Sequence, residues 1–418
     1  MNKNVASKRP QELSRRLRLL YLDFNVGYMN PTRNLLPEAL AKASDLTIFG
    51  PGHSTPEEVE AGPYVFAERH GPFDAVMGNE FSLLRPGLSE EELRGYSFKS
   101  HACRFNPTWR WKGSDYFTFI KEFSGHRFLS LFQLDYYNLT EDLIGMLEEI
   151  SDYYICLGQE FHPQKPVLLP DNLLSHGMNR HIFERWNNNY YNFIRRNEAC
   201  ILSTPHFVDL TTPYSAPLEQ RPCPWSVLGS DYDARVKSKL MLDEADIKRA
   251  GAWLPYIYAL ASKLGFNLYS RYWTIGLLNK LFETAMRRSR YSFTCGSVLH
   301  WPIRKFFEIP ANGCVLVTDG CNGFEALGFK DRKNAIACDP KDILSVHAWL
   351  EENPALAQTI ADAGRSLIAE QHTIEARARQ LKESFLHIQE DRFHGSYWAE
   401  GKLQFRTPSR VKMASSEC

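Results

Sequence analysis

Residues 291–334 decide the fold of this chain, and their sequence is YSFTCGSVLHWPIRKFFEIPANGCVLVTDGCNGFEALGFKDRKN. The apolar segment Tyr291–Thr294 has the composition of a buried strand and ends at a turn that contains glycine. Pro302 suits the first turn of a helix, and Gly313 suits its end. A second apolar segment, 314–318, follows at once. The order strand, loop, helix, strand predicts a sheet whose strands are joined by helices.

The same alternation recurs along the rest of the chain. Apolar segments bounded by turn residues predict buried parallel strands at 19–22, 46–49, 75–77, 128–132, 153–157 and 199–202 in the first half. A second series is predicted at 225–229, 291–294, 314–318 and 335–338. Helical sequence separates many of these strands, for example at 35–43 and 141–150. We therefore expect an α/β protein with two Rossmann-like, doubly wound domains.

Length and proline content divide the chain. Its 418 residues exceed the roughly 250–300 at which a single hydrophobic core stops growing. Four prolines between Thr211 and Pro224 disfavour helix and central strand, so we expect a connector at 213–224. The predicted units are a flexible leader at 1–18, an N-terminal domain at 19–212, this connector, a C-terminal domain at 225–393 that ends in helices, and a tail at 394–418.

Composition excludes several classes of protein. Forty-nine basic residues balance forty-nine acidic ones, so no overall field favours nucleic acid, and an anionic ligand needs a local site. No apolar run approaches the roughly 18 residues of a spanning helix, so we expect at most peripheral membrane contact. The polar, basic leader lacks the apolar core of a secretory signal, and nine cysteines are an odd number without a CxxC pair. We expect a cytoplasmic protein with reduced thiols.

Four stretches of the second half carry a family resemblance. Phe307–Asp319 has the form FEIPA-x-G followed by an apolar strand and TD, and Phe324–Phe329 has the form FE-x-x-GF. The stretch DPKDI begins at Asp339, and Trp225–Arg235 contains Gly-Ser followed by arginine. Residues 225–385 thereby resemble the C-terminal domain of glycosyltransferases with the GT-B fold, especially the CgeB-like branch.

The resemblance implies a site for a nucleoside diphosphate sugar in the C-terminal domain and an acceptor site in the N-terminal one. Glu308 matches the glutamate that accepts hydrogen bonds from the ribose diol. Amides of a glycine turn attract phosphate, and basic side chains neutralise a diphosphate. The residues expected to bind the donor are Gly229, Arg235, Gly296, Ser297, His300, Arg304, Lys305, Glu308, Asn322, Gly323, Phe324 and Glu325.

The chain departs from the family at one position. Retaining members often carry a glutamate eight residues before the one matched by Glu308, and His300 stands there instead. The stereochemical outcome therefore stays open. An inverting enzyme needs a base, for which we expect His53, after the second predicted strand. Rival histidines are His101, His162, His181 and His206.

The expected activity is transfer of a sugar from a uridine or guanosine diphosphate donor to a hydroxyl of a glycan or lipid-linked precursor. We expect no metal cofactor, because the family resembled is metal-independent and the Asp-x-Asp at Asp231–Asp233 is short enough to occur by chance. Two alternatives stay open: a catalytically inactive binding or scaffold protein on the same fold, and a sugar-nucleotide epimerase.

Overall fold

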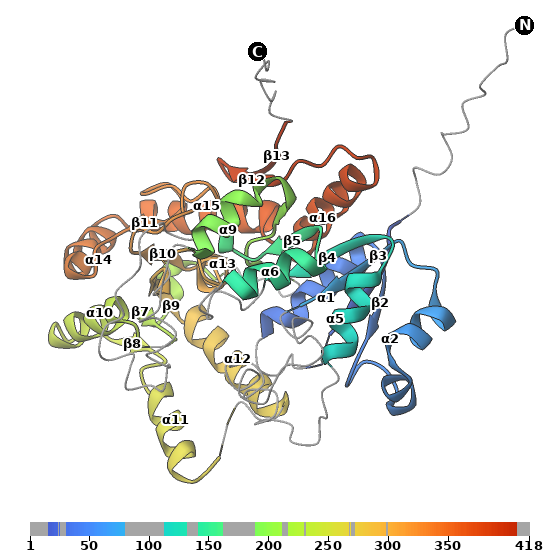
Figure 1. Ribbon diagram of the computed structural model, residues 1–418. Helices are drawn as coiled ribbons and strands as arrows, with labels where there is room; N and C mark the ends of the chain where they lie inside the picture. The colour runs from blue at the N-terminus through green and yellow to red at the C-terminus, as the bar shows by residue number, and fades with distance from the viewer. Residues whose placement is uncertain are drawn as a thin grey trace, which may run out of the picture.

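The computed structural model contains two parallel sheets, each covered by helices (Figure 1). It describes residues 16–23, 25, 31–79, 113–131, 141–161, 189–210, 216–229, 231–266, 268, 272–297 and 300–407. Most of the expected leader and the end of the expected tail lie outside these ranges, as do His101, His162 and His181.

The N-terminal sheet has six strands in the order β2-β1-β3-β4-β5-β6, and every pairing is parallel. The six predicted strands are confirmed, with ends that differ by one or two residues. The strands are β1 (Arg18–Leu22), β2 (Asp45–Phe49), β3 (Ala75–Gly78), β4 (His126–Ser130), β5 (Tyr153–Cys156) and β6 (Ile201–Ser203). The described helices of this half are α1 (Pro31–Ala43), α2 (Pro56–His70), α5 (Gly113–Glu122), α6 (Glu141–Ile150) and α9 (Asn189–Arg196), with short 3-10 turns η3 (Gln159–Phe161) and η4 (Glu198–Cys200).

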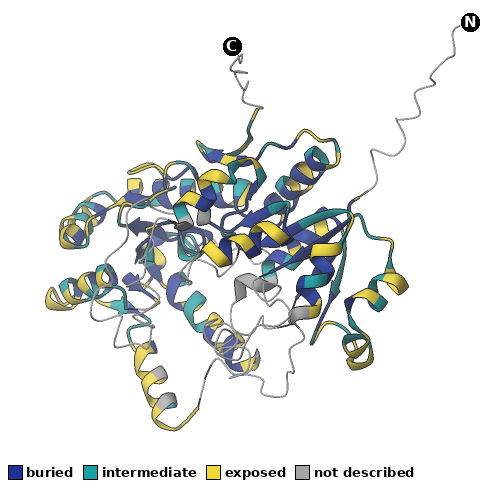
Figure 2. Cartoon of the chain, in the orientation of Figure 1, coloured by how far each residue is buried: buried dark blue, intermediate teal, exposed yellow. Residues whose placement is uncertain are grey.

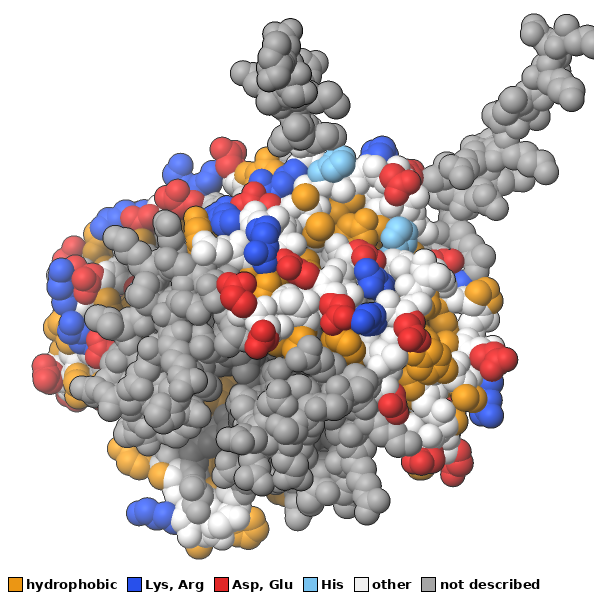
Figure 3. All heavy atoms as spheres, viewed as in Figure 1, with side chains coloured by type: hydrophobic (Ala, Val, Ile, Leu, Met, Phe, Trp, Pro, Cys, Tyr) orange, Lys and Arg blue, Asp and Glu red, His pale blue; other side chains and the backbone are white. Residues whose placement is uncertain are grey.

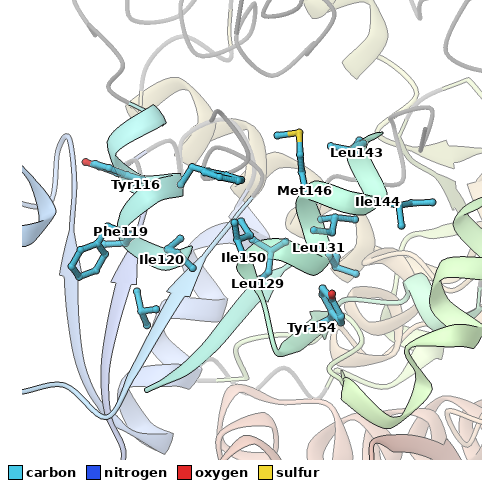
Figure 4. Close-up of a cluster of buried hydrophobic side chains, with 14 of the residues drawn as sticks. Tyr116, Phe119, Ile120, Leu129, Leu131, Leu143, Ile144, Met146, Ile150 and Tyr154 are labelled. Carbon is cyan, nitrogen blue, oxygen red and sulfur yellow. The ribbon is translucent and has the colours of Figure 1, made fainter. Parts of the chain in front are cut away.

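Both faces of this sheet are buried, which explains the nearly continuous apolar character of its strands. Successive side chains of a strand point to opposite faces, so Leu20 and Leu22 of β1 join one core while Leu19 and Tyr21 join the other. Figure 4 shows the first core, where α5 and α6 cover the sheet through side chains such as Ile120. Helix α1 covers the opposite face.

The C-terminal sheet is also wholly parallel and has the order β11-β10-β9-β7-β8. Its strands are β7 (Cys223–Val227), β8 (Arg249–Ala250), β9 (Ser289–Thr294), β10 (Val315–Thr318) and β11 (Ile336–Ala337). Its helices are α10 (Asp233–Glu244), α11 (Leu254–Lys263), α12 (Tyr272–Arg287), α13 (Lys305–Ala311), α14 (Ile343–Glu352) and α15 (Pro354–Gln371), with η5 (Leu218–Gln220) and η7 (Pro340–Asp342). The expected α/β class with two doubly wound domains is confirmed.

The decisive unit, 291–334, forms as predicted with one difference at the helix start. Helix α13 begins at Lys305, three residues after Pro302, and its first turn closes where Phe307 donates its amide to the Arg304 carbonyl at 3.0 Å. At the other end, Gly313 takes φ 67°, and the amides of Gly313 and Cys314 donate back to Pro310 and Ile309. A glycine is favoured there because this backbone region is strained for other residues.

The last helix, α16 (Ile374–Gln389), packs on the N-terminal domain although its sequence lies in the range 225–393 expected for the other one. Its apolar stripe, which includes Leu381 and Phe385, enters the same core as Leu36 and Leu40 of α1. The physical reason is that α1 alone leaves part of that sheet face uncovered, and the stripe of α16 buries it.

The structure also corrects the predicted end of the connector and the predicted tail. Pro224 belongs to β7 and not to the connector, and it stands before the pairing with β8 begins at Trp225, where a missing amide costs least. The expected tail contains an antiparallel hairpin, β12 (Ser396–Ala399) and β13 (Lys402–Phe405). Ser396 ties the hairpin to the N-terminal sheet, since its Oγ accepts the Ser203 amide at 2.9 Å.

Candidate functional site

The strand order of the C-terminal sheet reverses between β7 and β9, and ligands of doubly wound folds bind at the carboxyl ends of strands at such a point. Gly229 follows β7 there, and Cys295 to Ser297 follow β9. Arg235 of α10 is buried and donates from Nη2 to the Thr294 hydroxyl at the end of β9, at 2.9 Å. This bond holds the guanidinium of Arg235 at the point where the strand order reverses.

Gly229 permits two cations to approach the backbone closely. It takes φ 110°, and a Cβ at this position would lie 2.8 Å from Nη1 of Arg235 and 3.2 Å from Cε of Lys305. Any larger residue would therefore be strained and would displace at least one of these side chains. Arg235 and Lys305, which are 70 positions apart in the sequence, meet over one glycine.

The beginning of α13 gathers two cations around one carboxylate. Glu308 lies one helical turn after Arg304 and Lys305, the spacing at which side chains on a helix meet. Oε1 of Glu308 is 2.7 Å from Nε of Arg304, and Oε2 is 3.3 Å from Nζ of Lys305. The Glu308 side chain is 16% exposed, so its carboxylate is largely buried between these two partners.

These charges perturb one another. Burial would raise the pKa of Glu308, but the positive charges of Arg304 and Lys305 and the hydrogen bond from Lys305 outweigh it and lower the pKa to about 2. Burial also lowers the pKa of Lys305, against the opposing pull of Glu308. Glu308 is thus ionised at neutral pH. Glu308 thus neutralises only part of the charge of Arg304 and Lys305, and Arg235 adds a third cation beside Lys305, so an anionic ligand would be attracted to this cluster.

The N-terminal domain contributes His206 to the same cluster. His206 follows β6, and burial together with the charge of Arg304 lowers its pKa to about 4. The ring is therefore neutral at pH 7, and Glu308 also acts on it electrostatically. Because His206 comes from one domain and Arg304 from the other, the cluster lies where the two domains face each other.

The glycine turn after β9 is closed by a carboxylate, which differs from the free amides expected there. The Gly296 amide donates to Oδ1 of Asp319 at 2.9 Å, and a Cβ on Gly296 would lie 2.8 Å from the Cβ of Cys321. Ser297 and His300 take positive φ values of 60° and 52°. His300 is exposed, and both residues lie beside the reversal point.

The loop after β10 serves mainly to hold the domains together. Nδ2 of Asn322 donates to the Phe161 carbonyl at 3.1 Å, and Gly323 packs so closely on the Phe161 ring that a Cβ would lie 2.6 Å from it. Phe324 is buried against Phe329, with ring centroids 5.5 Å apart, so its side chain is part of the core and not the donor contact that we expected. Glu325 is exposed.

His53, the expected base, lies apart from this cluster. It is an exposed residue after β2, whose sheet neighbour is β1. The η3 turn that meets the C-terminal domain follows β5, which is four strand spacings away from β2, or about 19 Å at the usual separation between strands. His206 is the histidine that the structure brings to the cluster.

A second buried polar group, which the sequence did not indicate, lies beside His206. Arg377 of α16 is fully buried and donates from Nη2 to the His206 carbonyl at 3.4 Å and to Nδ1 of His372 at 3.3 Å. Burial raises the pKa of Glu160 to about 7, although a hydrogen bond from Ser203 and the charge of Arg377 oppose it. The burial of Arg377 could not be predicted from the sequence, because an arginine in an amphipathic helix is ordinarily exposed.

The two carboxylates of the Asp-x-Asp sequence have separate surroundings in the structure. Asp231 is ion-paired with Lys239, and Asp233 begins α10. Within the described ranges, no three His, Cys, Asp or Glu side chains are grouped so that they could hold a metal ion.

Comparison with known proteins finds a family match over part of the C-terminal half. Residues 259–383, which include β9, α13 and β10, match the model of the glycosyl transferase-like family. This part of the chain is therefore similar to a glycosyl transferase-like domain, and the two doubly wound domains agree with the GT-B arrangement that the sequence predicted. The narrower resemblance to the CgeB-like branch stays a prediction.

Solved structures with a similar arrangement share little sequence with this chain. HepE of Anabaena, solved with UDP, is 11% identical, and the alignment covers 88% of this chain and 99% of HepE with a TM-score of 0.48. Sucrose-phosphate synthase of Thermosynechococcus elongatus is 13% identical, over 90% of this chain and 100% of its own, with a TM-score of 0.48. The lipopolysaccharide outer core galactosyltransferase WaaB is 9% identical, over 90% and 100%, with a TM-score of 0.42. No curated protein matches the chain.

Proposed function

We propose that this protein transfers a sugar from a nucleoside diphosphate sugar, with uridine or guanosine as the base, to a hydroxyl acceptor. One observation carries the proposal: at the strand-order reversal of a glycosyl transferase-like domain, Arg304 and Lys305 pair with the buried carboxylate of Glu308, and Arg235 meets Lys305 over Gly229. A diphosphate has the charge and size to fill such a place.

The chemistry follows from where negative charge develops. The acceptor oxygen forms a bond to the anomeric carbon, the bond from that carbon to the phosphate oxygen breaks, and the diphosphate leaves with the electron pair. Arg304 and Lys305 would stabilise the leaving diphosphate, the role that a metal ion has in other enzymes. We accordingly propose that no metal is needed.

Glu308 has two tasks in this proposal. Its carboxylate holds Arg304 and Lys305 in place, and a carboxylate oxygen has further lone pairs with which to accept hydrogen bonds from a ribose diol. Because its lowered pKa keeps it ionised at neutral pH, both tasks are available to the folded protein.

The acceptor proton needs a base on the opposite side of the cluster. His206 is the described histidine that lies beside Arg304, and its neutral ring can accept a proton. We propose His206 for this role in an inverting reaction, with His53 as the competing candidate. The acceptor is proposed to be a glycan or a lipid-linked precursor reached from the cytoplasm.

Ligand-induced stabilisation tests the donor site. Uridine or guanosine diphosphate at about a hundred times its dissociation constant should stabilise the fold by roughly 2.7 kcal/mol, with or without EDTA. Uridine and guanosine alone, which lack the diphosphate, should shift the melting temperature far less.

A pair of matched variants localises the effect. Arg304→Met should abolish most of the shift because it removes a cation from the cluster. Arg290→Met removes an arginine with the same 2.7 Å distance to a carboxylate, that of Glu351, and should leave the shift unchanged. If no nucleoside diphosphate stabilises the wild-type protein, the donor proposal is wrong. Nucleotide binding without turnover of any nucleotide sugar would favour the inactive binding protein.

A further inference from the structure

Helix α11 presents its apolar face to solvent. Tyr256, Ile257 and Leu260 lie on one side of α11, and Trp253 and Leu264, which flank its two ends, continue the spacing of three or four residues from Tyr256 and Leu260. All five are exposed, with Tyr256 at 76% and Leu260 at 59%. A helix of a globular domain ordinarily turns such a stripe inward, and the outward orientation marks an interaction surface.

Apolar side chains are also exposed just after α11, at Phe266, and on α12. Phe266, Trp273 and Leu277 are more than half exposed, whereas Ile275 and Leu278 on the other side of α12 are buried. We call the exposed set the α11–α12 apolar face, and it consists of Trp253, Tyr256, Ile257, Leu260, Leu264, Phe266, Trp273 and Leu277. Figures 1 and 2 show α11 projecting from the body of the protein, with exposed residues along it.

The charges around this face have one sign. Between Asp246 and Glu283 the sequence contains no acidic residue and five basic ones, at positions 248, 249, 263, 271 and 280. Arg249 is paired with Asp243, but Lys263 and Lys280 are exposed and form no salt bridge with any residue that the structure describes. In Figure 3 a Lys or Arg side chain lies beside apolar ones at the projecting tip of the molecule.

We propose that the α11–α12 apolar face docks the protein on an anionic membrane surface. Tryptophan and tyrosine favour the boundary between lipid headgroups and acyl chains, and leucine and phenylalanine insert below it. Lys263 and Lys280 are placed to meet the headgroups of anionic lipids, which attract basic residues. The docking is peripheral, because no described helix is long and apolar enough to cross a bilayer.

The charge pattern favours lipid over a second copy of this chain. A self-complementary interface would bring the same uncompensated lysines together across a two-fold axis, and like charges repel there. A bilayer that contains anionic lipid supplies the missing negative charge.

The position of this face relative to the proposed site fits a lipid-linked acceptor. Phe282 of α12 lies under Nζ of Lys305, which is 5.1 Å from the ring centroid. Leu277 of the apolar face is five residues earlier in the same helix, about 7.5 Å along its axis. Docking does not depend on the nucleotide proposal, since it rests on other residues.

Vesicle flotation of the full chain tests the inference. The protein should bind vesicles in which about a third of the phosphatidylcholine is replaced by phosphatidylglycerol, and high salt should weaken the binding. Tyr256→Ser with Leu260→Ser should lower the partition coefficient about tenfold or more, since two apolar side chains no longer insert. Lys263→Glu with Lys280→Glu should weaken binding to vesicles that contain phosphatidylglycerol but not binding to vesicles of phosphatidylcholine alone.

Controls separate docking from folding and from self-association. Leu356→Ser changes an exposed leucine on α15, at 41% exposure, and should leave flotation unchanged. The stabilisation by uridine diphosphate should persist in every surface variant, so the two proposals can fail independently. The inference would be overturned if the wild-type protein did not bind the vesicles that contain phosphatidylglycerol. It would also be overturned if the double variant Tyr256→Ser with Leu260→Ser bound them as well as the wild-type protein does. A wild-type dimer that this variant converts to a monomer, with flotation unchanged, would assign the face to self-association instead.

Discussion

Replacing Glu308 by glutamine should destabilise the protein even without ligand. The folded-state pKa is about 2 against an ordinary value of 4.5, and the side chain is largely buried between Arg304 and Lys305. A difference of this size corresponds to about 3 kcal/mol of unfolding free energy at neutral pH. Because the pKa is lowered on folding, this contribution is present above about pH 4.5 and is lost as the pH falls toward 2.

Urea unfolding measures this effect directly. At neutral pH, Glu308→Gln should lower the free energy of unfolding by about 3 kcal/mol, and the gap between variant and wild type should narrow as the pH falls below 4.5. Glu351→Gln is the control, because its ion pair with Arg290 is more exposed and such pairs contribute about 0–1 kcal/mol. Equal stabilities of Glu308→Gln and wild type would refute the argument from buried charge.

The same variant separates the two tasks proposed for Glu308. Loss of a charge-assisted bond to the ribose should weaken nucleoside diphosphate binding about tenfold or more. Inorganic pyrophosphate has no ribose, so its binding should stay equal or become tighter when the competing carboxylate is removed. If titration calorimetry shows both ligands binding more tightly to the variant, Glu308 is a counter-ion and not a ribose ligand.

Two histidine predictions concern catalysis and acid stability. His206→Gln should lower turnover about 10²-fold with donor affinity unchanged, whereas His53→Ala should match wild type; the reverse pattern in steady-state assays would return the base to His53. Burial and the charge of Arg377 lower the pKa of His372 to about 3, although a hydrogen bond to the Leu327 carbonyl opposes this shift. As the pH falls below 6.5, His372 is therefore protonated in the unfolded chain before it is protonated in the folded protein. His372 should therefore contribute a loss of about 2 kcal/mol of unfolding free energy between pH 7 and 5, and His372→Asn should remove this part of the pH dependence measured by urea unfolding.

Local sequence patterns predicted most of the strands and helices of the fold. Apolar segments such as 153–157 gave the strands because a strand with both faces buried needs apolar side chains throughout. Gly313 marked the end of a helix correctly, since its effect acts through bonds to neighbouring backbone groups. Pro224 misled the prediction, because the cost of a proline in a strand depends on which edge is paired at that residue.

Part of the site was also predictable from local sequence. Arg304, Lys305 and Glu308 lie within five positions, so helical spacing alone brings them together. The buried position of Arg377 escaped prediction, because one of its partners, the carbonyl of His206, lies 171 positions earlier in the chain.

The sequence by itself determined the alternation of strands and helices, the family resemblance of the second half and the charged turn of α13. These are properties of short stretches, where periodicity and capping depend on residues a few positions apart. Only the tertiary structure decided that Arg235 and Lys305 meet over Gly229, that His206 lies near Arg304 and Glu308, and that α16 returns to the N-terminal domain. Those outcomes depend on strand order and on which apolar surface is left uncovered, and both are set by contacts between segments far apart in the chain.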